Sequence, residues 1–140
     1  MAIKTPPSGY SGTPLVKKLG IKAGNIITVV NAPDHYYGLL IDLPTGVLFV
    51  ADEAERKHLV HYFTKDADEL TAAISSLKAQ ILPNGMIWIS WPKKASKVVT
   101  DITEDVIRDL ALANGLVDVK VCAVDEVWSG LKLVIPVKNR

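Results

Sequence analysis

The chain has 140 residues, which is the size of a single domain and long enough to bury a substantial hydrophobic core. Its composition, 49% hydrophobic and 22% charged, is that of a globular protein and excludes an intrinsically disordered one. The 16 Lys and Arg residues nearly balance the 15 Asp and Glu residues, so the formal net charge is +1. Overall charge therefore gives no argument for a nucleic-acid partner, and we expect none.

The single cysteine, Cys122, excludes an internal disulfide and any zinc site built from several cysteines. It lies in the apolar run VDVKVCAV, which favours a small buried side chain over a reactive thiol. The N-terminal segment holds no apolar signal-peptide core, and no apolar run approaches the ~20 residues of a membrane span. We therefore expect a cytoplasmic protein without a membrane partner, and the sequence leaves a homo-oligomer open.

Local patterns predict an arm followed by one domain. Residues 1–12 are rich in Pro, Gly and Ser, which is typical of an irregular arm, and residues 13–140 show no repeat or second boundary. In chain order the patterns predict a short helix over 15–20 with Thr13 as N-cap and Pro14 at its first position, a strand over 25–31, a short helix over 33–40, and strands over 46–52 and 57–64. They then predict a helix over 67–81, a strand over 86–92, a helix capped by Asp101 or Thr103 that ends at about Ala113, and strands over 116–126 and 131–138.

Three local signals carry most of this prediction. NIITVVN, residues 25–31, is β-branched and almost continuously apolar, as in a parallel strand that is covered on both faces. Asp66 and Glu69 stand in capping-box spacing before a helix with apolar residues along one side. WSG, residues 128–130, is so short a link that the last two strands must form an antiparallel hairpin.

The alternation of helices and strands predicts an α/β fold. We expect a three-layer, Rossmann-like domain with a mostly parallel sheet of about six strands and an antiparallel hairpin at its C-terminal end. In such sheets, ligands bind beyond the carboxyl ends of the parallel strands.

The segments after the predicted strands carry more functional side chains than the turns at the opposite edge. Those turns, LGIKAG, LPTG, LPNG and ANG, contain little besides turn residues. If the strands are parallel, the other edge brings together our candidate ligand-binding residues: Asn31, Asp34, Trp91, Lys93, Lys94, Ser96, Asp125, Glu126 and Trp128.

The loop SWPKKAS, residues 90–96, is the most site-like of these segments. Lys93 and Lys94 would supply positive charge and Ser96 a hydroxyl donor to a phosphate, a carboxylate or a nucleotide. The start of the following helix would add backbone amides and a favourable dipole. A solvated turn before a helix explains the same residues, so both interpretations remain open.

The aromatic and acidic candidates also have two interpretations. Trp91 and Trp128 stand at strand ends, where they would either stack on a base or sugar or pack against the core. Asp125 and Glu126 are adjacent, so on an extended strand they face opposite sides and do not form a carboxylate pair for acid–base chemistry.

The three histidines do not predict a metal site. His58 and His61 are three residues apart on a predicted strand and so face opposite ways, and His35 is distant in the sequence. A single histidine remains open as a general base, and an enzyme would draw its acid or base from His35, Asp34 or Asp125.

Several common motifs are absent from the sequence. The turn after the first predicted strand reads NAPDHYYGLL, where a dinucleotide-binding fold has G-x-G-x-x-G. G-x-S-x-G, H-E-x-x-H and C-x-x-C are absent as well. The sequence therefore assigns no cofactor.

Three stretches, YSGTPLVKKLGIKAG, SWPKKASKVVTDITEDVIRD and GLVDVKVCAVDEVWSGLKLV, resemble an uncharacterised bacterial family, a domain of unknown function of the DUF3052 type. The resemblance covers most of the chain and implies no activity. VKVCAVDEVWSGLKLVIP also resembles the end of the class I methyltransferase sheet, which closes with a strand, a short turn and an antiparallel last strand. The glycine-rich first loop of that family, which holds S-adenosylmethionine, has no counterpart in NAPDHYY, and the acid at the end of its second strand would be Asp52.

Three functions remain open at this stage. The first is a binding module for a small anionic metabolite or nucleotide at the carboxyl ends of the parallel strands. The second is a divergent, methyltransferase-like enzyme that works in the same crevice. The third is a protein-interaction domain whose contact surface is formed by the SWPKKAS and DEVWSG loops. Whether the chain is an enzyme is not decided by its sequence.

Overall fold

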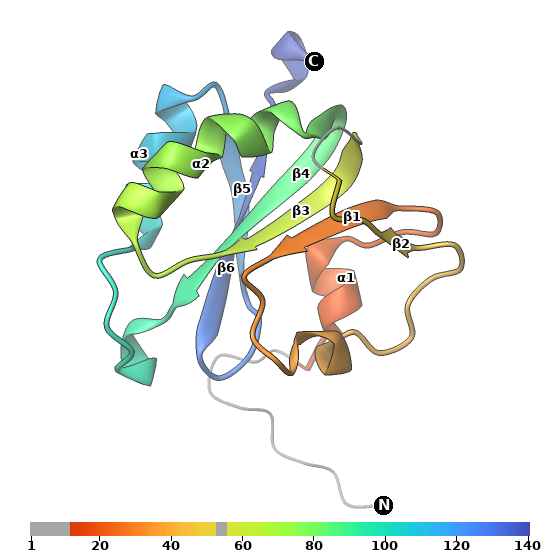
Figure 1. Ribbon diagram of the computed structural model, residues 1–140, viewed down its shortest axis with the longest axis horizontal. Coiled ribbons are helices and arrows are strands. Elements are labelled where there is room, and N and C mark those ends of the chain that lie inside the picture. Colours follow the sequence, from red (N-terminus) through yellow and green to blue (C-terminus); the bar gives the residue numbers. More distant parts are fainter. Residues whose placement is uncertain (1–11, 53–55) are drawn as a thin grey trace, which may run out of the picture.

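A six-stranded sheet with helices on both faces forms the body of the molecule (Figure 1). The computed structural model describes residues 12–52 and 56–140, so residues 1–11 of the expected arm lie outside the described residues. Within those two ranges, no helix has the length and apolar character that a membrane span requires. The elements are α1 (Leu15–Leu19), β1 (Ile26–Val30), the 3-10 helix η1 (Tyr36–Leu39), β2 (Leu48–Phe49), β3 (Lys57–Phe63), α2 (Ala67–Ala79), β4 (Ile81–Pro92), the 3-10 helix η2 (Lys94–Ser96), α3 (Glu104–Ala113), β5 (Val117–Ala123), β6 (Trp128–Val134) and the 3-10 helix η3 (Val137–Asn139).

The strand order across the sheet is β2-β1-β3-β4-β6-β5. Strands β2, β1, β3 and β4 pair in parallel, whereas β6 is antiparallel to both of its neighbours, β4 and β5. Strand β5 therefore runs in the same direction as β4. The predicted α/β class, the mostly parallel six-stranded sheet and the antiparallel C-terminal hairpin are confirmed.

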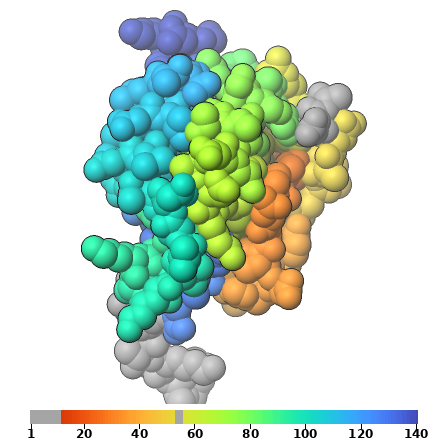
Figure 2. Space-filling model, turned by 60° about the vertical axis from the view of Figure 1, so that its left-hand side comes forward, coloured from red at the N-terminus to blue at the C-terminus, as the bar shows by residue number. Residues whose placement is uncertain are grey.

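Each face of the sheet packs its own apolar cluster. Helices α2 and α3 lie side by side over one face (Figure 2), where Ile74 of α2 joins the same cluster as Ile87 of β4. Helix α1 and η1 cover the other face, and there Leu19 and Tyr36 share a cluster with Trp88. Because α1 has only five residues, this second layer is thin.

Three further details of the elements differ from the prediction. Pro14, not Thr13, holds the N-cap position of α1. Strand β2 is limited to Leu48–Phe49, since only these two residues pair with β1. Trp128, expected in a turn, instead opens β6 by pairing with Pro92 of β4.

The predicted turn LPNG, residues 82–85, lies inside β4 rather than before it. Strand β4 already begins at Ile81, which pairs with Lys57, and the register then shifts before the pairing resumes at Met86. Gly85 permits this irregularity, because a Cβ there would lie 3.0 Å from the carbonyl oxygen of Lys57.

The long helices begin where the sequence predicts. Asp66 caps α2, and its Oδ1 accepts hydrogen bonds from the backbone N–H groups of Asp68 and Glu69 at 2.8 and 3.2 Å. Thr103 caps α3 by accepting from the N–H of Val106 at 3.2 Å. Both helices lie on the face of the sheet opposite α1, so the two caps set where the helices of that layer begin.

Candidate functional site

The carboxyl ends of β1, β3, β4 and β5 lie at one edge of the sheet, because these strands run in the same direction (Figure 1). Asn31 follows β1, Lys93 follows β4, and Asp125 lies in the turn between β5 and β6. The structure therefore places these three candidate residues at the same edge. Among the pockets that reach this edge, one lies at the end of β1 and another between α1 and β5.

Asp125 joins two loops of this edge. Its Oδ2 accepts a hydrogen bond from Nε2 of His35 at 2.6 Å, which ties the loop after β1 to the β5–β6 turn. Its Oδ1 accepts from the backbone N–H groups of Val127 and Trp128 at 2.8 and 2.7 Å. Because both carboxylate oxygens have partners within the fold, the geometry favours a structural role for Asp125 over that of a catalytic acid.

The first pocket lies where the strand order reverses between β1 and β3, and we call it the switch-point pocket. Its volume is about 460 Å³. Trp128 forms one wall and packs edge-on against the ring of Phe63, with the centroids 5.1 Å apart. The lining residues are Asn31, Pro33, Phe63, Thr64, Lys65, Asp66, Glu69 and Trp128.

Asn31 lines the switch-point pocket, and two hydrogen bonds hold its side chain in place. Its φ of 59° lies in the left-handed region, which asparagine tolerates better than most residues. Its Nδ2 donates to the carbonyl oxygen of Phe63 at 3.3 Å and to Oε1 of Glu69 at 3.4 Å. Glu69 also accepts from the hydroxyl of Tyr62 at 3.0 Å. Burial, and then the bond to Glu69, raise the pKa of Tyr62 well above its usual value.

The residues after β1 do not fit S-adenosylmethionine in the way that the methyltransferase resemblance would require. Residues 31–37 contain no glycine, so side chains stand where that family presents bare backbone to its cofactor. Asn31 is committed to Phe63 and Glu69, and the ring of Tyr36 is fully buried against the sheet.

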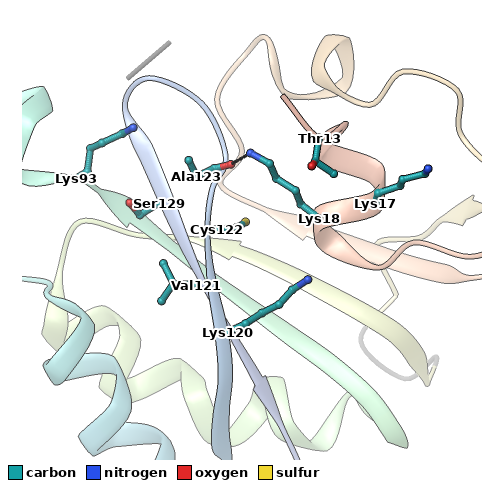
Figure 3. Close-up of a pocket in the computed structure, with 9 residues that line it drawn as sticks. All are labelled: Thr13, Lys17, Lys18, Lys93, Lys120, Val121, Cys122, Ala123 and Ser129. Atoms are coloured by element: carbon teal, nitrogen blue, oxygen red, sulfur yellow. Dashed lines mark hydrogen bonds between the residues drawn. The ribbon is translucent and has the colours of Figure 1, made fainter. Parts of the chain in front are cut away.

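The second pocket opens between α1 and β5 and is rich in lysine (Figure 3). We call it the lysine pocket, and its volume is about 570 Å³. The lysines come from α1, from the segment after β4 and from β5, and none of the lining residues that the structure describes is acidic. The lining residues are Thr13, Lys17, Lys18, Lys93, Lys120, Val121, Cys122, Ala123 and Ser129.

Burial and positive charge shift the pKa values of groups in and beside the lysine pocket. Burial lowers the pKa of Lys18, and Lys93 lowers it further, while Cys122 acts in the opposite direction. Burial and then Lys120 likewise lower the pKa of Lys132 on the neighbouring strand. Burial raises the pKa of Cys122 to about 11, which keeps its thiol protonated at neutral pH.

The candidate residues of the SWPKKAS loop do not line one common site. Lys93 lines the lysine pocket, whereas Lys94 lines a different pocket of about 520 Å³ beside α3. The hydroxyl of Ser96 is engaged within the loop, where it donates to the carbonyl oxygen of Lys93 at 2.7 Å and accepts from the N–H of Val98. Trp91 is only 8% exposed and packs in the core beneath α2 and α3.

Two further candidates lie outside the pockets. Asp34 and Glu126 are exposed and line neither the switch-point pocket nor the lysine pocket. The structure thus brings Asn31 together with Trp128, and Lys93 together with the α1 and β5 lysines, but not all candidates in one site. The positions of Lys18 and Lys120 at the lysine pocket were not predicted from the sequence.

A serine–histidine pair lies deep in the sheet. His61 is hydrogen bonded through Nδ1 to the hydroxyl of Tyr36 at 2.8 Å and through Nε2 to Oγ of Ser90 at 2.7 Å. All three residues are fully buried, so substrate has no access to them. Burial lowers the pKa of His61 to about 3, and the network is a neutral structural one.

Comparison with solved structures shows the class I methyltransferase fold. A SAM-dependent methyltransferase from Aquifex aeolicus superposes with a TM-score of 0.60 at 12% identity, covering 91% of this chain and 91% of that chain. Magnesium protoporphyrin IX methyltransferase from Synechocystis PCC 6803 with bound SAH superposes with a TM-score of 0.56 at 13% identity, covering 86% of this chain and 78% of that chain. No curated protein sequence matches the chain. Residues 39–137 match the family described as "Protein of unknown function (DUF3052)", and the chain belongs to this family.

Proposed function

We propose that this chain is a binding module for a small anionic metabolite or nucleotide, which it holds in the lysine pocket. The observation that carries the proposal is the convergence of four lysines from three separate segments on one cavity of about 570 Å³. Cavities of this size are typical of small-molecule sites. The pocket reaches the carboxyl ends of β4 and β5, the edge at which open α/β sheets bind their ligands.

The electrostatics of the pocket support an anionic ligand. Like charges that gather in one place raise the energy of the free protein, and a bound anion relieves that repulsion. Burial is the largest cause of the lowered pKa of Lys18, and the positive charge of Lys93 lowers it further, as expected where cations gather. Lys120 lies over the ring of Trp88, with Nζ 6.0 Å from the centroid, which orients its ammonium group beside the cavity.

Replacing Lys93 with alanine is expected to weaken the binding of pyrophosphate by roughly 10- to 100-fold, since a hydrogen bond to a charged group contributes about 1.5 to 3 kcal/mol. Isothermal titration calorimetry at low salt measures this change. Binding should also weaken as salt is added, because mobile ions screen the lysines.

Lys94→Ala provides a matched control. It removes the same charge from the adjacent position, but Lys94 lines the pocket beside α3 and not the lysine pocket. We expect its pyrophosphate affinity to stay within about twofold of the wild type, a change of less than 0.5 kcal/mol. Equal losses in the two variants would mean that the loop binds the anion without the lysine pocket, and an affinity unchanged by Lys93→Ala would remove the proposal.

A divergent methyltransferase-like enzyme is the alternative, and its support is the likeness of fold. The switch-point pocket is its natural site, but the side chains of residues 31–37 do not fit the cofactor in the way that the resemblance implies. A lysine-lined cavity does not need that cofactor, so the observations favour the anion-binding module over the enzyme.

A further inference from the structure

Lys18 is the most unusual of the four lysines in the lysine pocket. Its residue is only 7% exposed, yet its side chain lines the cavity. Its Nζ donates to the carbonyl oxygen of Ala123 at 2.9 Å, a bond between α1 and the end of β5 that Figure 3 shows across the pocket. The amine is therefore held in a fixed place at the wall of the cavity, unlike Lys17 next to it, which is exposed.

The surroundings of Lys18 raise the share of its neutral, nucleophilic form above that of an exposed lysine, because they lower its pKa. Burial is the largest cause of its lowered pKa, and the positive charge of Lys93 is a second. A buried lysine beside another cation is a common way for a protein to make an amine nucleophilic near neutral pH. In its neutral form the amine donates through its N–H groups, as it does to the carbonyl oxygen of Ala123, and hydrogen bonds of this kind do not use the lone pair that attacks a carbonyl carbon.

The other residues of the pocket would hold a ligand against this amine. Lys17, Lys93 and Lys120 supply charges for a phosphate or carboxylate group. The hydroxyls of Thr13 and Ser129 belong to the same lining. An anion that also carries a carbonyl group would thus be anchored by its charge and presented to Lys18.

We propose that Lys18 attacks the carbonyl carbon of an anionic aldehyde bound in the lysine pocket and forms an imine with it. The amine nitrogen first bonds to the carbonyl carbon to give a carbinolamine. The C–O bond then breaks, and the oxygen leaves as water with the two hydrogens of the amine, so no oxidant or reductant is needed. The inference rests on the proposed function, since the pocket must first bind the anion.

The test uses the full chain with pyridoxal 5′-phosphate, a phosphate-bearing aldehyde, followed by borohydride to reduce the imine. Peptide mapping by mass spectrometry should find the stable adduct at Lys18 at equimolar reagent. Lys18→Met and Lys18→Arg should both lose it, the second while keeping the positive charge. Lys22→Met, which replaces an exposed lysine outside the pocket, should keep it. Excess pyrophosphate should reduce the labelling by competing for the pocket.

Adducts spread over the exposed lysines, or labelling that survives Lys18→Met, would overturn the inference. Calorimetry with pyrophosphate separates this failure from failure of the proposed function. If the wild type binds pyrophosphate but forms no adduct at Lys18, the anion site stands and the imine does not. If the wild type binds no pyrophosphate, both the proposed function and the inference that rests on it are wrong.

Discussion

Replacing Trp88 with alanine is expected to lower the free energy of unfolding by about 3 to 5 kcal/mol, a large part of the stability of a domain of this size. Trp88 is fully buried in β4, and its Nε1 donates to the carbonyl oxygen of Leu19 at 2.9 Å. Gly130 of β6 faces the ring, and a Cβ there would lie 3.1 Å from Cε3 of Trp88. With no side chain at Gly130 to fill the space, the substitution leaves a cavity and an unpaired carbonyl group.

Urea unfolding followed by circular dichroism measures this loss. Trp128→Ala is the control, because Trp128 is a half-buried tryptophan on the same side of the sheet and should cost less. Trp88→Phe should fall between the two, since it keeps a ring but leaves the Leu19 carbonyl without its donor. A loss for Trp88→Ala no greater than that for Trp128→Ala would contradict the account of the core.

Acidification is expected to cost roughly 4 kcal/mol of stability through His61 alone, if the pH is lowered from 6.5 to 3. Burial lowers the pKa of this residue from 6.5 to about 3 in the folded chain. Between these values the unfolded chain binds a proton at residue 61 that the folded chain does not. Stability therefore falls as the pH falls, by about 1.4 kcal/mol per pH unit.

The comparison of wild type with His61→Gln isolates this effect. Glutamine can still bond to Tyr36 and Ser90 but has no proton to gain, and the carboxylates that titrate in the same range are common to both proteins. We expect urea unfolding between pH 6 and pH 4 to give a shallower dependence for the variant, by about 1.4 kcal/mol per pH unit. Parallel pH dependences would show that His61 accepts a proton in the folded state.

The elements with strong local signals were predictable from the sequence. The apolar run over 25–31 and the Asp66 cap gave a strand and a helix where the structure has β1 and α2. The bounds of β4 were not predictable, because LPNG has the composition of a turn and only the pairing of Ile81 with Lys57 extends the strand past it. Trp128 was missed as a strand residue for the same reason, since its pairing with Pro92 is a long-range contact.

The site was harder to predict than the fold. The direction of the strands was inferred correctly, and it explains why Asn31, Lys93 and Asp125 share an edge. That Lys18 lines the same pocket as Lys93 could not be inferred from the sequence. Lys18 reaches the end of β5 through its bond to Ala123, and no local pattern links two residues that are 105 positions apart. The one available signal was the alternation in VDVKVCAV, which puts Lys120 and Cys122 on the same face of a strand.

The central claim is that one pocket between α1 and β5 binds an anion. Its most direct test is a pyrophosphate titration of ¹⁵N-labelled protein followed by NMR. The account predicts saturable shifts of the backbone amides of the lysine pocket, with Lys18, Ala123 and Ser129 foremost, and little change at Lys94 or Lys97. Shifts confined to the loop over 94–100, or no saturable shift at any residue, would contradict it.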